Sequence, residues 1–263
     1  MSVPHISRFV LRFFCGIVRG YFRRHFSGVR LSRESNLAHF GDERLIVYAN
    51  HSSWWDPMVL VLLAEKLMPR RNHFAPMDAA ALERYGILKR IGVFDVEMKT
   101  ARGAVQFLRT GTAIVESDGV LWVTPQGRFA DARERPLGFK PGLAALAAKM
   151  DGGCTMLPLA IEYVFWDERL PETLLRFGEP VRVNGQNADE VQQLLEAALL
   201  KTMEALKVEA MARDTAAFSL MLDGTVGTGG FYEFGQHAMA MVRRRRFRPE
   251  HSAIAGQRQE DRG

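Results

Sequence analysis

The chain has 263 residues, of which 47% are hydrophobic and 25% are charged. This composition is typical of globular proteins and excludes a disordered chain, and the length suffices for one or two domains with a buried core. Two cysteines, Cys15 and Cys154, exclude a disulfide-rich scaffold and a paired-cysteine zinc or redox motif. We expect both to be structural thiols.

The formal net charge of +5 is distributed unevenly. Residues 1–33 contain seven arginines and no acidic residue, and residues 237–263 contain seven arginines and three acidic residues. The remaining residues 34–236 therefore carry a net charge of −6. An acidic body with two basic ends favours contact with an anionic membrane surface, whereas a nucleic-acid-binding protein usually carries its positive charge on the folded body.

Residues 6–26 combine apolar side chains with regularly spaced arginines. On a helix, four of these arginines fall within about 60° of one another, namely Arg8, Arg12, Arg19 and Arg23. The pattern predicts an amphipathic helix that lies on a membrane surface. The arginines interrupt the apolar stretch too often for a membrane-spanning helix. Two alternatives are a helix packed on the body with solvated arginines and a mitochondrial transit peptide, which is also rich in arginine.

Short apolar runs and helical periodicity alternate along the rest of the chain. We predict strands at residues 45–49, 72–75, 92–96, 119–124 and 155–163, and helices at residues 57–67, 79–85, 100–115, 141–150 and 189–210. This alternation predicts an α/β fold with a mostly parallel sheet flanked by helices, in addition to the N-terminal amphipathic helix.

We predict that the chain is divided into three parts. Residues 1–33 form the basic helix and a connector, residues 34–210 form the central domain, and residues 211–263 form a C-terminal extension. Within the extension, residues 221–235 are rich in glycine and predict a loop or hinge. Beyond residue 242 we expect an arginine-rich, flexible tail.

The segment Asn-His-Ser-Ser-Trp-Trp-Asp at residues 50–56 follows the first predicted strand of the central domain. On one continuous helix His51 and Asp56 would point about 140° apart, so they meet only if His51 lies in the loop and Asp56 in the first helical turn. Asp56 would then orient the imidazole, and His51 would act as a general base. The alternative is a surface histidine near an aspartate that the helix dipole favours. Trp54 and Trp55 either line an acyl pocket, lie at a lipid interface or pack in the core.

A turn with basic residues follows the predicted strand at 119–124. It comprises Pro125, Gln126, Gly127 and Arg128, and it is followed by Lys140 and Gly142 near a predicted helix start. Backbone N–H groups and basic side chains in this arrangement favour an anion-binding cradle. The segment lacks the pattern of a P-loop, and the alternative is an ordinary turn between strand and helix.

Together these motifs resemble those of the glycerolipid acyltransferases typified by bacterial 1-acylglycerol-3-phosphate acyltransferases. The resemblance covers residues 35–165. His51 and Asp56 match the first sequence block of the family, and Gly92-Val93-Phe94 match the second. Pro125 and Gly127 match the third block, and Phe139, Lys140 and Gly142 match its extension. Leu157-Pro158-Leu159 match the fourth block.

The resemblance implies transfer of a fatty acyl group from a thioester, either acyl-CoA or acyl carrier protein, to a hydroxyl of a lipid acceptor. It implies that His51 and Asp56 are the catalytic pair, and that Pro125, Gln126, Gly127, Arg128, Lys140 and Gly142 bind substrate. It also implies a peripheral membrane protein on the cytoplasmic face, with the lipid surface and the thioester donor as partners. No metal, resident cofactor, covalent acyl-enzyme or nucleic-acid partner is expected.

Two departures from the family pattern bear on the acceptor. Gln126 stands where the family usually has glutamate, and Asp95 and Glu97 lie where the second block usually has an arginine. A less basic site predicts an acceptor other than lysophosphatidate, such as a glycolipid, a pigment sugar or an amino-lipid hydroxyl. One alternative function is a non-catalytic lipid-binding relative. Another is nucleic-acid binding through the arginine run at residues 243–246.

Overall fold

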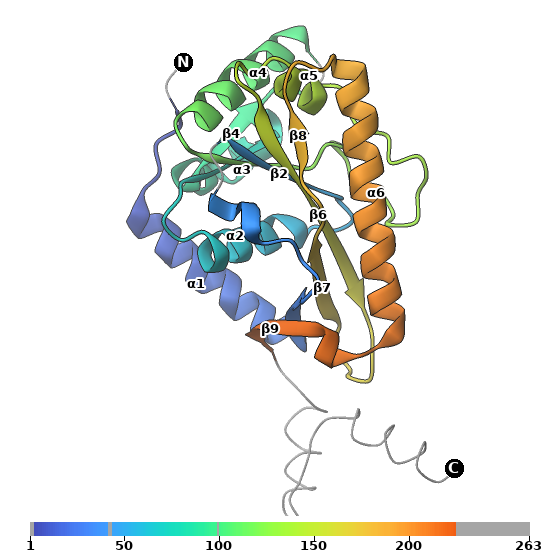
Figure 1. The fold of residues 1–263 in the computed structure, drawn as a ribbon. Coiled ribbons are helices and arrows are strands. Elements are labelled where there is room, and N and C mark those ends of the chain that lie inside the picture. The colour runs from blue at the N-terminus through green and yellow to red at the C-terminus, as the bar shows by residue number, and fades with distance from the viewer. Residues whose placement is uncertain (1–2, 42–43, 99, 225–263) are drawn as a thin grey trace, which may run out of the picture.

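The computed structural model describes residues 3–41, 44–98 and 100–224 (Figure 1). The strands in these residues are β1 (Gly28–Ser32), β2 (Leu45–Ala49), β3 (His73–Asp78), β4 (Val93–Val96), β5 (Val120–Val123), β6 (Cys154–Val164), β7 (Glu172–Phe177), β8 (Val181–Val183) and β9 (Phe218–Asp223). The α-helices are α1 (Arg8–His25), α2 (Asp56–Leu67), α3 (Ala79–Arg84), α4 (Ala101–Glu116), α5 (Gly142–Ala148) and α6 (Ala188–Ala212). Short 3₁₀ turns are η1 (Ala38–Gly41), η2 (Gly86–Ile91) and η3 (Thr215–Ala217).

The described strands form one sheet in the order β4-β3-β5-β2-β6-β7-β1-β9, with β8 paired to β6. The strands β4, β3, β5, β2 and β6 run parallel to their neighbours in this order, and β1 is parallel to β7. The pairs β6–β7, β6–β8 and β1–β9 are antiparallel. The fold is therefore mixed α/β with a mostly parallel sheet flanked by helices, as predicted.

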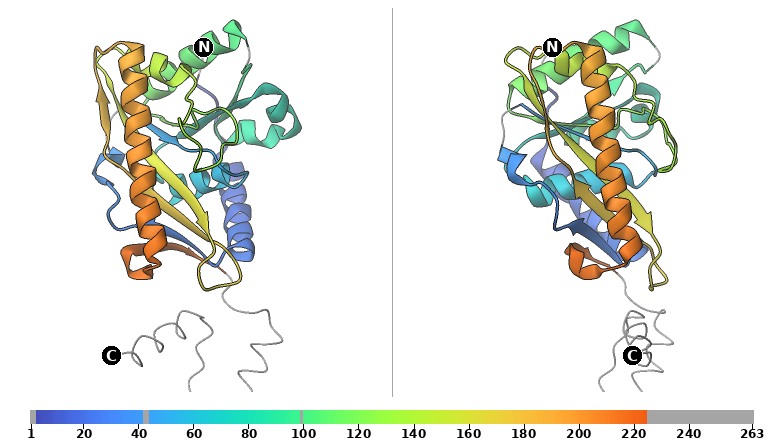
Figure 2. Two further views of the ribbon diagram at one scale, coloured as in Figure 1. Left: turned by 90° about the vertical axis from the view of Figure 1, so that its right-hand side faces the viewer. Right: turned by 45° about the vertical axis from the view of Figure 1, so that its right-hand side comes forward.

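Helices cover both faces of the sheet. Figure 2 shows α6 on one face and α1 with α2 on the opposite face. The strand β2 alternates between two hydrophobic clusters, because Ile46 and Tyr48 pack with α4, α5 and α6, whereas Leu45 and Val47 pack with α1 and α2. This two-sided burial explains why β2 reads as a continuous apolar run.

Each predicted strand and helix is present, with ends that differ by at most a few residues. The strands β1, β7, β8 and β9 were not predicted. Residues 28–32, expected in the connector, form β1, and residues 218–223, expected in the C-terminal extension, form β9 of the same sheet. The predicted loop at 221–235 therefore starts too early, because Leu222 is buried and pairs with Val29. The remainder of that loop, the tail beyond residue 242 and the arginine run at 243–246 lie outside the described residues.

Helix α1 packs against α2 through a row of buried residues, which are Cys15, Val18 and Phe22. A second apolar row remains exposed and comprises Phe9, which is 82% exposed, together with Phe13, Ile17 and Tyr21. Within residues 3–41, 44–98 and 100–224, no helix is both long and apolar enough to cross a membrane. Burial raises the pKa of Cys15 and of Cys154 to about 11, so both remain protonated thiols at neutral pH.

Candidate active site

The sequence-predicted site residues lie where two neighbouring parallel strands end. The segment containing His51 and Asp56 follows β2, and the turn containing Gln126 follows β5. Because β2 and β5 pair in parallel, with Tyr48 opposite Val123, their carboxyl ends lie at the same edge of the sheet. Ligand sites of α/β proteins commonly form at this edge.

His51 and Asp56 contact each other directly. Nδ1 of His51 lies 2.8 Å from Oδ2 of Asp56, and the aspartate is 0% exposed. An ionised carboxylate only accepts hydrogen bonds, so Nδ1 carries the proton and Nε2 is the acceptor in the neutral imidazole. The side chain of His51 is 16% exposed, which leaves the imidazole partly open to solvent.

The local fold that brings the pair together is the one that the spacing requires for a contact. His51 lies in the loop after β2, and Asp56 is the first residue of α2, with Pro57 in the first turn where a proline is tolerated. The backbone N–H of Ser53 donates to Oδ2 of Asp56 at 2.9 Å, which folds the carboxylate back toward the loop.

The loop is also anchored at its start by Asn50, which is buried. The side-chain amide of Asn50 donates to the carbonyl of Ile161 at 2.9 Å, and its oxygen accepts from the N–H of Ile161 at 2.9 Å. This pair of bonds joins the end of β2 to β6. Sequence reasoning did not single out Asn50 by itself, because its partner lies 111 residues away in the chain.

The side chain of Gln126 hydrogen-bonds to the backbone of His51 rather than to Arg128. The side chain of Gln126 is only 4% exposed. Its oxygen accepts from the backbone N–H of His51 at 2.9 Å, and its amide nitrogen donates to the carbonyl of Leu137 at 3.3 Å. A glutamate would keep the first bond but lack the second, so the amide suits this position for a structural reason.

Lys140 lies across the turn formed by Pro125 and Gly127. Gly127 has a φ of +61°, and a Cβ placed on it would lie 2.7 Å from Nζ of Lys140. The backbone N–H of Lys140 donates to the carbonyl of Pro125 at 2.9 Å. The third block and its extension are therefore in contact, and Gly142 begins α5 two residues later.

Arg128 is exposed and forms an ion pair with Glu134, in which Nη1 lies 3.1 Å from Oε2. The hydrogen bond from Arg128 lowers the pKa of the Glu134 carboxyl below its usual value. The next residue, Phe129, packs on the site, with its ring centroid 4.6 Å from that of His51. Arg128 is therefore adjacent in sequence to a residue that contacts the imidazole, and its own charge is already paired.

The two acidic residues of the second block are both hydrogen-bonded near the start of α4. The amide nitrogen of Gln106 donates to the Asp95 carboxylate at 3.4 Å and to its backbone carbonyl at 3.0 Å. The hydroxyl of Thr100 donates to the Glu97 carboxylate at 3.0 Å.

The two tryptophans have different surroundings. Trp55 packs edge-on against Phe26 at 4.8 Å between ring centroids and also contacts Phe22 of α1. Trp54 is 58% exposed and lies beside Trp55. Trp55 therefore packs against the N-terminal helix, and Trp54 extends the exposed apolar surface.

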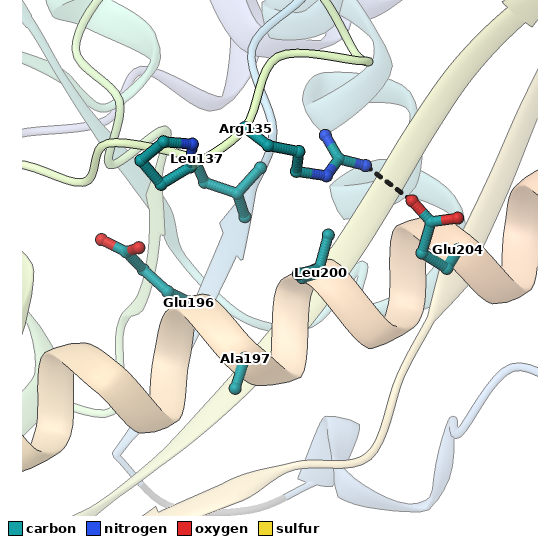
Figure 3. Close-up of a pocket in the computed structure, with 7 residues that line it drawn as sticks. Arg135, Leu137, Glu196, Ala197, Leu200 and Glu204 are labelled. Carbon is teal, nitrogen blue, oxygen red and sulfur yellow. Dashed lines mark hydrogen bonds and ion pairs between the residues drawn. The ribbon is translucent and has the colours of Figure 1, made fainter.

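A shallow pocket lies between α6 and the loop that precedes Phe139 (Figure 3). Its volume is about 580 Å³, and its lining comprises Arg135, Pro136, Leu137, Glu196, Ala197, Leu200 and Glu204. An ion pair of 2.7 Å between Arg135 and Glu204 spans one end. The carbonyl of Leu137, which receives the Gln126 bond, connects this wall to the loop that holds His51.

Residues 28–162 match the family model for acyltransferases. The chain belongs to the acyltransferase family, of the 1-acylglycerol-3-phosphate acyltransferase type. No curated protein matches this chain. The family match begins at β1 and ends within β6, so it includes the loops that carry His51, Asp56 and Gln126.

Proposed function

We propose that this acyltransferase moves a fatty acyl group from a thioester, acyl-CoA or acyl carrier protein, to a hydroxyl of a lipid acceptor. His51 acts as the general base, and Asp56 orients it. The observation that carries this proposal is the 2.8 Å contact between Nδ1 of His51 and Oδ2 of Asp56, because it leaves Nε2 to accept a proton.

The proposed reaction needs one proton acceptor. The acceptor hydroxyl gives its proton to Nε2 of His51 while its oxygen attacks the thioester carbonyl carbon. The buried carboxylate of Asp56 stabilises the imidazolium that forms. The carbon–sulfur bond then breaks, and the thiolate takes the proton from Nε2. The products are an ester and a free thiol, and His51 returns to its neutral form without a covalent acyl-enzyme.

Substrate binding is assigned to the turn after β5 and to its extension. Lys140 forms no ion pair within the described part of the chain. We therefore propose that its ammonium group binds an anionic group of a substrate. Pro125, Gln126 and Gly127 shape the turn, and Gly142 starts the helix behind it. Since Glu134 already pairs with Arg128, we propose an acceptor that presents a hydroxyl without a phosphate beside it.

A thiol-release assay tests the reaction. Acyl-CoA and acyl carrier protein thioesters are offered with lysophosphatidate, diacylglycerol and glycolipid acceptors, and thiol release is compared between the natural chain and His51→Ala. We expect His51→Ala to lower turnover at least ~100-fold, the low end of general-base contributions. His5→Ala, which alters an exposed histidine, is the control and should keep full turnover. Equal activity of His51→Ala and the natural chain would overturn the mechanism.

We also propose that α1 rests on an anionic bilayer as a peripheral anchor on the cytoplasmic face. The exposed row of Phe9, Phe13, Ile17 and Tyr21 supports this, because surface helices bind membranes through such rows. Trp54 is also exposed and lies beside Trp55, which contacts α1, and amphipathic tryptophan rings are favoured at lipid interfaces. Arg12 is exposed on the same helix, and each basic residue near an anionic surface contributes about 1 kcal/mol.

Sedimentation with vesicles tests the anchor on the full chain. The double variant Phe13→Glu/Ile17→Glu should lose binding to phosphatidylglycerol vesicles. The matched control is Val208→Glu/Met211→Glu, which changes two exposed apolar residues of α6 on the opposite face (Figure 2). The control should bind like the natural chain. Equal sedimentation of both variants would contradict the proposed anchor.

The alternative function is lipid binding without catalysis. The replacement of the family's usual glutamate by Gln126 favours it, because the third block has lost its acidic residue. This alternative expects vesicle binding through α1 with no thiol release from any donor. The contact between His51 and Asp56 favours the enzyme, because lipid binding has no need of an oriented imidazole.

A further inference from the structure

Tyr163 is a partly buried residue next to the site, and the mechanism above does not use its hydroxyl group. It lies near the end of β6, which continues past β2, since Ala49 at the end of β2 pairs with Leu159. The hydroxyl of Tyr163 donates to Oδ1 of Asp56 at 2.6 Å. The family match ends at residue 162, one residue before Tyr163.

We propose that Tyr163 is a positioning residue, whose hydroxyl holds Oδ1 of Asp56 so that Oδ2 stays aligned with Nδ1 of His51. This inference rests on the proposed function of His51 as the general base. The role of Tyr163 is to fix the orientation of the Asp56 carboxylate.

The carboxylate of Asp56 needs such a partner. Rotation about the terminal bond of an aspartate side chain has a broad profile, so the plane of the carboxylate can turn away from the imidazole at little cost. Oδ2 serves both Ser53 and His51, whereas Oδ1 accepts from Tyr163. A donor on Oδ1 from a rigid strand therefore selects one orientation of the carboxylate.

Tyr163 is itself held in place and stays protonated. Its ring lies 5.8 Å from that of Phe26, and its backbone pairs with Thr173 of β7. Burial raises the pKa of Tyr163 well above its usual value, and the neighbouring charge of Asp56 and the hydrogen bond to it raise the pKa further. The hydroxyl consequently donates to the carboxylate throughout the working pH range.

The test compares Tyr163→Phe with Tyr48→Phe. Tyr48 is a buried tyrosine whose hydroxyl donates to the carbonyl of Leu195 at 3.2 Å, so the control also loses one hydroxyl hydrogen bond. We expect Tyr163→Phe to lower kcat about tenfold, the low end of what one hydrogen bond to a charged group contributes. The KM values of donor and acceptor should not change, and Tyr48→Phe should keep the natural kcat.

A second readout does not need turnover. Nitrogen NMR of labelled histidine, assigned with His51→Ala, reports which ring nitrogen carries the proton. The natural chain and Tyr48→Phe should show the proton of neutral His51 on Nδ1. Tyr163→Phe should show a mixture of both tautomers, because the carboxylate no longer holds one orientation.

Two further variants separate positioning from packing. In an Asp56→Asn background, Tyr163→Phe should change kcat less than about twofold, because a residue that acts through Asp56 has nothing left to orient. Should Tyr163→Phe fail to fold, p-aminophenylalanine at position 163 keeps the ring and a donor. Its kcat should lie within about threefold of the natural value, near the effect of one neutral hydrogen bond.

The outcomes are distinguishable. An unchanged kcat together with an unchanged Nδ1 tautomer in Tyr163→Phe would overturn the positioning role. An equal loss in the Asp56→Asn background, or a folded p-aminophenylalanine variant as slow as Tyr163→Phe, would overturn it as well. If no donor and acceptor pair turns over in the natural chain, the proposed function fails, and the NMR comparison still decides whether Tyr163 orients the pair.

Discussion

The side chain of Lys140 lies directly over the backbone of Gly127. A Cβ on Gly127 would lie 2.7 Å from both Cε and Nζ of Lys140, and Gly127 has a φ of +61°. Gly138, in the same loop, has a φ of +66°, but a Cβ there would meet only the carbonyl of Pro136 at 4.0 Å. The two glycines therefore share the backbone conformation, and only Gly127 also provides space for the lysine.

Replacing these glycines by alanine separates the two requirements. Each of Gly127→Ala and Gly138→Ala should lower the free energy of unfolding by about 1–2 kcal/mol, because alanine is strained in the left-handed region. Gly127→Ala should in addition displace Lys140 and reduce turnover to the level of Lys140→Ala, whereas Gly138→Ala should keep full turnover. Thermal unfolding and thiol release measure the two effects. Full turnover in Gly127→Ala would show that the position of Lys140 is unimportant.

The pairing of Arg128 with Glu134 predicts an effect on acceptor choice. Glu134→Gln removes the negative charge and leaves the guanidinium free to bind an anion. We expect kcat/KM for lysophosphatidate to rise about twofold to fivefold relative to a neutral acceptor, a modest change because the pair is exposed to solvent.

The control for this prediction is Asp131→Asn. Asp131 pairs with Arg133 in the same loop, and both side chains are exposed. This variant changes the net charge by the same amount without releasing Arg128, so it should not alter the ratio. A rise of equal size in both variants would mean that net charge alone controls the preference.

Gln126→Glu restores the residue that the family usually has at this position and should nevertheless be harmful. The carboxylate would keep the bond from His51 but lose the bond to Leu137 in a buried site. We expect the free energy of unfolding to fall by about 1–3 kcal/mol, measured by urea denaturation. Gln186→Glu is the control, because the oxygen of Gln186 accepts from the N–H of Asn184 near the surface and remains an acceptor. Equal stability of both variants would contradict the structural role of the amide.

His73 predicts a pH dependence of stability. Trp122 donates to its Nδ1 at 3.1 Å, and Nε2 lies 2.8 Å from the carbonyl of Met68, so the neutral ring satisfies both partners. Burial is the main cause that lowers the pKa of His73 from 6.5 to about 4. The unfolded chain therefore binds a proton at this residue over a range where the folded chain does not, and the free energy of unfolding falls as the pH falls from 6.5 to 4.

The His73 contribution to that fall should be on the order of 3 kcal/mol. His73→Gln should show a shallower dependence on pH between these values, whereas His25→Gln, which alters an exposed histidine of α1, should follow the natural chain. Urea denaturation at a series of pH values measures the slopes. Identical slopes for His73→Gln and the natural chain would refute the assignment.

The strands that were predicted from the local sequence and the strands that were not predicted lie in different parts of the sheet. The central strands β2, β5 and β6 are buried on both faces and read as apolar runs. The strands β1 and β9 lie toward one edge, and each includes polar residues, such as Arg30 and Ser219. They pair with each other, and β1 also pairs with β7, so the extended conformation of each depends on a strand that lies far away in the sequence.

The site shows the same division. The spacing of His51 and Asp56 and the strand–loop–helix order around them left two alternatives, a direct contact or a surface histidine, and the structure has the contact. Gln126, by contrast, was expected among the substrate-binding residues, and in the structure its side chain accepts from the backbone N–H of His51. Nothing near Tyr163 in the sequence marks it, because its partner Asp56 lies 107 residues away.

The sequence by itself determined the alternation of strands and helices, the separation of charge between the basic N-terminus and the acidic body, and the family. These properties depend on periodicity, composition and motifs, which are local. Only the tertiary structure decided which side chains hold His51 and Asp56, that Glu134 pairs with Arg128, and that Lys140 crosses Gly127. Each of these contacts joins loops whose separation is set by the packing of the sheet, and a hydrogen bond tolerates errors of only a few tenths of an ångström.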